Sequence, residues 1–124
     1  MAPLTRFATT ALLLVASNVF MTFAWYGHLK YKHSALWLAI LVSWGIAFFE
    51  YCLQVPANRI GHGMMSASQL KVLQEVITFL VFGIFSTYWL NEKLTWHDKM
   101  AFVFIVAAAG MGLWKSWDAG KLSP

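Results

Sequence analysis

Hydrophobic positions along the chain fall into four long runs that are separated by short polar segments. The runs cover residues 5–26, 34–56, 68–90 and 100–117. At 1.5 Å per helical residue, each run is long enough to cross a hydrocarbon core about 30 Å thick. The connections 28–33, 57–67 and 91–99 leave no room for a second domain. The pattern predicts an all-α integral membrane protein, with one four-helix transmembrane bundle over residues 1–124.

Aromatic residues near the ends of the runs support these boundaries, since tryptophan and tyrosine prefer the membrane–water interface. Trp25 and Tyr26 end the first run, where a signal peptide would carry a cleavage site of small residues. The first run is also longer than the hydrophobic region of a signal peptide. We therefore expect it to remain in the mature protein as the first span.

Composition excludes several other classes of protein. Hydrophobic residues make up 60% of the chain and charged residues 11%, against roughly 25% charged in soluble domains, so neither a soluble globule nor a disordered chain fits. The single cysteine, Cys52, has no disulfide partner, and no histidines and cysteines show zinc-ligand spacing. Lysines and arginines are scattered, without a basic run or stripe. We expect no cofactor, no metal and no nucleic-acid partner.

The basic residues give almost no preference for one orientation in the membrane. The side with both termini collects five, Arg6, Arg59, Lys71, Lys115 and Lys121, and the other side four, Lys30, Lys32, Lys93 and Lys99. One interpretation is a weak signal for termini inside the cell. The other is insertion in both orientations, which would permit an antiparallel homodimer.

Two carboxylates, Glu50 and Glu75, lie within the second and third runs. A charge at that depth costs about 2.5–3.5 kcal/mol on insertion scales, so each requires a reason. Because one turn joins these helices, both should lie at similar depth, in the half nearer the termini. Burial and a neighbouring carboxylate both favour the protonated form, so the pair can hold a proton near neutral pH. A group that exchanges a proton for a cation is the basis of an antiporter site.

Polar residues at helical spacing form stripes in the first three runs, and we expect these stripes to face a shared interior. Aromatic side chains near the carboxylates are suited to cation–π contacts with an organic cation. The candidate substrate- and proton-binding residues are Ser17, Asn18, Ser43, Trp44, Glu50, Tyr51, Gln54 and Glu75.

Each candidate also has a structural interpretation. Glu75 has Lys71 one turn earlier as a local ion-pair partner. Ser17 and Asn18 are typical of hydrogen bonds between membrane helices. The aromatic residues can simply face lipid or pack between helices. Glu50 has no basic residue within a turn, although Arg59 is near in sequence, so Glu50 is the stronger functional candidate.

The fourth run has no polar stripe but contains small residues, including Ala108-x-x-x-Gly112. This spacing allows another helix to approach closely. The pattern predicts either a dimer interface at Ala108 and Gly112 or close packing within one chain.

Residues 88–96 contain Leu90-x-Glu92-x-Leu94-Thr95, and Ala109-Gly110-Met111-Gly112 follows in the last run. Together with 49–61, these segments resemble the drug/metabolite transporter (DMT) superfamily, especially its small four-helix members. The resemblance covers the whole chain and implies a single four-helix repeat. It extends more distantly to the small multidrug resistance exporters, which are antiparallel dimers with a glutamate in the first membrane helix. Here Ser17 and Asn18 stand at that depth, so an equivalent charge must come from Glu50 or Glu75.

These observations favour a small multi-pass transporter, in a bacterial inner membrane, that acts as a homodimer. Its expected chemistry is proton-coupled exchange of a small cationic or amphipathic solute. The alternative is an accessory membrane subunit that packs against a partner protein or lipid. An enzyme fits worst, because no nucleophile with a neighbouring base and no metal-ligand cluster is apparent.

Overall fold

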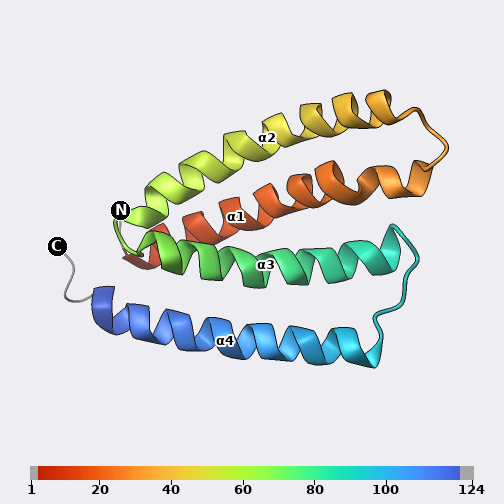
Figure 1. Cartoon of the computed structure of the whole chain (residues 1–124). Coiled ribbons are helices and arrows are strands. Elements are labelled where there is room, and N and C mark those ends of the chain that lie inside the picture. Colours follow the sequence, from red (N-terminus) through yellow and green to blue (C-terminus); the bar gives the residue numbers. More distant parts are fainter. Residues whose placement is uncertain (1–2, 121–124) are drawn as a thin grey trace.

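The computed structural model describes residues 3–120, and this part of the chain contains helices and no strand. The long helices are α1 (Pro3–Tyr26), α2 (Leu36–His62), α3 (Ala67–Tyr88) and α4 (Trp96–Gly120), and a short 3-10 helix, η1 (Gly27–Tyr31), follows α1. The helices run alternately up and down, so the start of α1 and the end of α4 lie at the same end of the bundle (Figure 1). The predicted all-α bundle is confirmed.

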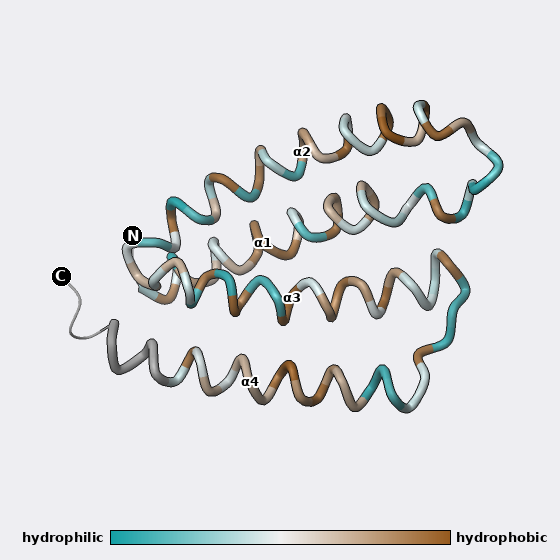
Figure 2. Tube along the Cα trace, viewed as in Figure 1, coloured by the Kyte–Doolittle hydropathy of each residue, from teal (hydrophilic) through white to brown (hydrophobic). Residues whose placement is uncertain are grey.

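Three helical segments are long and apolar enough to span a membrane: α1 with η1, α2 and α3. Figure 2 shows hydrophilic residues gathered at the α1–α2 and α3–α4 connections. α4 is not among these segments over residues 96–114, the part of it whose side chains the structure describes, and its first turn contains His97, Asp98 and Lys99. Its 25 residues make it about 37 Å long, and it runs antiparallel to α3 (Figure 1). The fourth crossing therefore stays a prediction, and Lys121 lies outside the described residues.

Hydrogen-bonding side chains fix where α3 and α4 begin. Ser66 and Gln69 form a capping box at the start of α3. Before α4, the Thr95 hydroxyl accepts from the Asp98 N–H at 3.2 Å, while the Asp98 carboxylate accepts from the Thr95 N–H at 2.9 Å. These side chains satisfy amide groups that have no partner inside a helix.

The prediction that the second helix ends at Pro56 is wrong, because α2 continues to His62 with Pro56 inside it. Proline removes only one backbone hydrogen bond from a helix, and packing compensates for that loss here. Ala57 is fully buried, Gly61 packs on α1 and α3, and Arg6 donates from Nε to the carbonyl oxygen of Ile60. The connection to α3 is therefore only a tight turn.

The apolar core lies where α1, α2 and α3 meet. Leu14, Ala57 and Ile77, one from each helix, form its centre. At the end near η1, Phe23 packs edge-on against Phe85 and Trp89, with ring centroids 5.0 Å apart in both pairs. Apolar contacts thus hold α1 against α3 at the middle of both helices and at the end near η1.

α4 packs on the outside of α3, away from α1 and α2 (Figure 1). A β-carbon at Gly112 would lie 3.5 Å from Val72 of α3, so Gly112 faces α3 within the same chain. Ala108 is exposed. The contact of Gly112 with α3 agrees with the second interpretation of the small residues, close packing within one chain. A dimer interface at Ala108 and Gly112 stays a prediction.

Candidate functional site

The carboxyl group of Glu50 is buried between α1 and α2. Its exposed fraction is 6%, and Ser17, which faces it from α1, is fully buried. The Ser17 Oγ lies 3.1 Å from the Glu50 Oε1 and 2.7 Å from the Gln54 Oε1. Glu50 and Gln54 are four residues apart on α2, so both point to the same side of that helix. Three of the predicted residues therefore form one hydrogen-bonded cluster.

The Ser17 hydroxyl carries a single hydrogen, so it donates to only one of these two oxygens. When Glu50 is ionised, Ser17 donates to the carboxylate, and the Gln54 amide can turn its NH2 group toward Ser17. When Glu50 is protonated, its O–H donates to Ser17, which in turn donates to the Gln54 carbonyl oxygen. A hydroxyl rotation and an amide flip convert one arrangement into the other. The cluster can therefore hydrogen-bond Glu50 in both protonation states.

Asn18, the next residue on α1, connects to α3 instead of α2. Its Oδ1 accepts from the Thr78 hydroxyl at 2.6 Å, and its Nδ2 donates to the Leu14 carbonyl oxygen at 2.7 Å. The Thr22 hydroxyl donates to the Asn18 carbonyl oxygen at 2.7 Å. Asn18 is 1% exposed. These contacts make it a cross-link between α1 and α3, the structural interpretation given above.

Glu75 belongs to a different environment from Glu50. It forms an ion pair with Lys71, with Nζ and Oε1 2.8 Å apart, and its side chain is 43% exposed. This is the local pairing that the sequence offered as an alternative. The expectation of one shared polar interior is therefore not met by the observed contacts: Ser17, Glu50 and Gln54 join α1 to α2, Asn18 and Thr78 join α1 to α3, and Glu75 pairs along α3.

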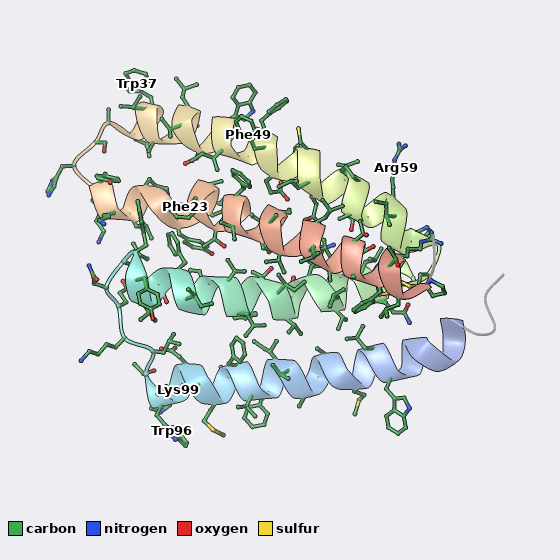
Figure 3. All side chains as sticks on the ribbon, turned by 180° about the vertical axis from the view of Figure 1, so that it is seen from behind. Phe23, Trp37, Phe49, Arg59, Trp96 and Lys99 are labelled. Carbon is green, nitrogen blue, oxygen red and sulfur yellow. The ribbon has the colours of Figure 1, made fainter. Side chains whose placement is uncertain are left out.

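The remaining candidates lie apart from this cluster. Ser43 lines a separate cavity of about 330 Å³ with Phe23 and Trp89, near η1. Trp44 and Tyr51 are exposed on α2, and the labelled Trp37 also points outward from that helix (Figure 3). Within one chain no hydrogen bond of the described residues joins Trp44 or Tyr51 to the Glu50 cluster.

Two polar contacts were not predicted from the sequence. Gln74 of α3 donates from Nε2 to the Asn58 Oδ1 of α2 at 2.8 Å, and Arg6 caps the end of α2. The sequence places Asn58 in the connection 57–67, because Pro56 predicts the end of the second helix. Only the longer helix aligns Asn58 with α3.

No group of three or more histidine, cysteine, aspartate or glutamate side chains within the described part of the chain is placed to hold a metal ion. The structure instead defines a class of protein: a multi-pass membrane bundle of apolar helices with a buried carboxyl cluster between two of them.

The chain belongs to the family described as "Putative member of DMT superfamily (DUF486)", whose model matches residues 10–112. The matched segment contains every candidate site residue and the predicted dimer pair. No curated protein and no solved structure matches the chain. Membership in this superfamily, together with the apolar helices, makes it a transporter-like membrane protein.

Proposed function

We propose that the protein is a small transporter that exchanges protons for a small cationic or amphipathic solute, with Glu50 as the shared binding group. Two observations support this: the superfamily is one of transporters, and Glu50 lies buried where a charged side chain needs a function. The proposal includes a homodimer, in antiparallel or parallel arrangement, in a bacterial inner membrane.

The observation that carries the proposal is the contact of Glu50 with Ser17 and Gln54. A carboxyl group used for exchange must be stable when protonated and when ionised, because it carries a proton on one half of the cycle and a cation on the other. Hydroxyl and amide groups serve this purpose, since both can donate and accept. A basic partner would instead hold the carboxyl group in its ionised form.

The other candidates take supporting roles in this proposal. Asn18 holds α1 against α3 and so positions Ser17, its neighbour in sequence. Glu75 is a secondary carboxylate whose charge is compensated by Lys71. Ser43, Trp44 and Tyr51 meet the solute on α2, where a second copy of the chain covers the exposed aromatic face, and Ala108 and Gly112 contribute to the contact between copies.

The test is transport by purified protein in liposomes, screened for solute-driven proton movement. Replacing Glu50 by glutamine preserves the shape of the side chain and its contact with Ser17 but removes the titration. We expect proton movement to fall to the level of empty liposomes, while the melting temperature stays the same or rises because no charge is desolvated.

Glu75→Gln is the matched control, since it makes the same chemical change in the exposed, ion-paired carboxylate. We expect Glu75→Gln to retain most of the transport. Full transport by Glu50→Gln, for any solute that the wild type exchanges, would show that the charge is assigned to the wrong helix. A folded wild type that moves no solute tested would favour the accessory-subunit alternative.

A further inference from the structure

A basic groove runs between α2 and α3 at the end of the bundle that carries the termini. It has a volume of about 750 Å³ and is lined by Val55, Asn58, Arg59, His62, Ala67, Leu70, Lys71 and Gln74. Three of these residues are basic, and none is acidic. None of Ser17, Glu50 and Gln54 lines the groove, so it is distinct from the carboxyl cluster.

The groove combines an apolar wall with charged groups at its mouth. Val55 and Leu70 supply apolar surface, and the Asn58–Gln74 hydrogen bond closes one part of the lining. Arg59 extends outward from α2 (Figure 3) and is exposed. Lys71 is also largely exposed, with 73% of its side chain accessible. This arrangement places acyl-chain contacts next to cationic groups, as at the boundary between the hydrocarbon core and the headgroups.

The charges in the groove are only partly compensated by acidic residues. Arg59 has no acidic neighbour among the ion pairs of the described residues, and Lys71 has only Glu75, which lies outside the groove lining. At the start of α3, the capping box already satisfies the amide groups of Ser66 and Gln69. The groove thus attracts an anion through its side chains, chiefly Arg59 and Lys71.

We propose that this groove binds the phosphate headgroup of an anionic phospholipid, with the acyl chains along Val55 and Leu70 and the phosphate between Arg59 and Lys71. A lipid fits better than a free phosphate, because half of the site is apolar and it lies at the end of two membrane-spanning helices. The proposal does not depend on transport and holds for either function considered above.

The experiment measures the thermal stability of the purified full chain in a neutral detergent, with three additives tested at equal concentration. These are dihexanoyl phosphatidylglycerol, dihexanoyl phosphatidylcholine and inorganic phosphate. We expect phosphatidylglycerol to raise the melting temperature in a saturable way, and the other two to have much smaller effects. Equal shifts with both lipids, or an equal shift with inorganic phosphate, would overturn the proposal.

Variants then locate the site. Arg59→Gln and Lys71→Gln should each weaken the apparent affinity for phosphatidylglycerol about five-fold at low salt, since one basic residue near a membrane surface contributes about that factor. Arg59→Lys should retain most of the affinity. Glu75→Gln should increase it, because Lys71 then has no competing partner. Lys93→Gln and Lys99→Gln, at the other end of the bundle, are controls with the same change in charge and should leave the affinity unchanged.

The gain with Glu75→Gln keeps the test informative even if a groove variant folds poorly. Unchanged affinity in both Arg59→Gln and Lys71→Gln, or an equal loss in the two controls, would refute the assignment to this groove.

Discussion

Gly61 lies where α2 packs closely on α1 and α3, and replacing it by alanine tests the packing of the bundle. A β-carbon at this position would lie 2.7 Å from the Leu70 Cδ2 and 2.8 Å from the Thr10 Cγ2, whereas ordinary contacts begin at 3.4 Å. Both obstacles are side chains on other helices, so α2 must move away from α1 and α3 or the side chains must leave their rotamers. Overpacking of this kind costs about 1–3 kcal/mol.

Alanine also has a favourable effect within a helix. It is more stable there than glycine by about 0.5–1 kcal/mol. Gly45 of the same helix separates the two effects, since a β-carbon at Gly45 meets nothing within 4 Å. We therefore expect Gly45→Ala to raise the free energy of unfolding by up to about 1 kcal/mol, and Gly61→Ala to lower it by about 1–2 kcal/mol.

The measurement is reversible unfolding in mixed micelles of a neutral detergent and dodecyl sulfate. Thr10→Ser removes the Cγ2 atom but keeps the hydroxyl, which donates to the Arg6 carbonyl oxygen at 2.8 Å. In the double variant it should recover part of the loss caused by Gly61→Ala. If Gly61→Ala is as stable as Gly45→Ala, the close approach of α2 to Thr10 and Leu70 is wrong.

Three further predictions follow from contacts described above. Asn18→Ala should lower the free energy of unfolding by about 1–2 kcal/mol, because the Thr78 hydroxyl loses its acceptor; an unchanged melting temperature would contradict the α1–α3 cross-link. Pro56→Ala should raise the free energy of unfolding by about 1–3 kcal/mol, since α2 is already continuous and gains a backbone donor. Unfolding of α2, seen as a loss of helical circular dichroism, would contradict this. Hydrogen bonds from the Thr95 backbone and hydroxyl hold the pKa of Asp98 below its ordinary value of 3.8, so the Asp98 cap stabilises α4 above that pH and is lost as the pH falls further. The protection of amides at the start of α4 against hydrogen exchange, relative to their intrinsic exchange rates, should fall below pH 3.8 in the wild type but not in Asp98→Asn.

The helices were predictable from the sequence because their signals are local. Runs of apolar residues, and the polar connections between them, mark all four helices to within a few residues at most ends. The end of α2 is the exception, because Pro56 is a strong local signal for a helix end, while the contacts of Ala57, Gly61 and Arg6 that oppose it come from other helices.

The candidate site was predictable in part for the same reason. Helical spacing places Glu50 and Gln54 on one face, and the apolar context identifies both as unusual. Spacing within a helix does not show which neighbour each face meets, so Ser17 and Asn18 were assigned to one interior although they face different helices. The similar depth of Glu50 and Glu75 in the predicted membrane helices likewise suggests a pair of carboxylates. Depth does not specify the direction in which the Glu75 side chain points, and it pairs with Lys71.

The position of α1 between α2 and α3 has a mechanical consequence. Because Ser17 and Asn18 are consecutive, their side chains leave α1 about 100° apart, and each holds a different neighbour. A rotation of α1 about its own axis cannot break one contact without straining the other. The hydrogen bond that reaches Glu50 on α2 and the one that reaches Thr78 on α3 are therefore both made by α1, from adjacent residues and with no loop between them.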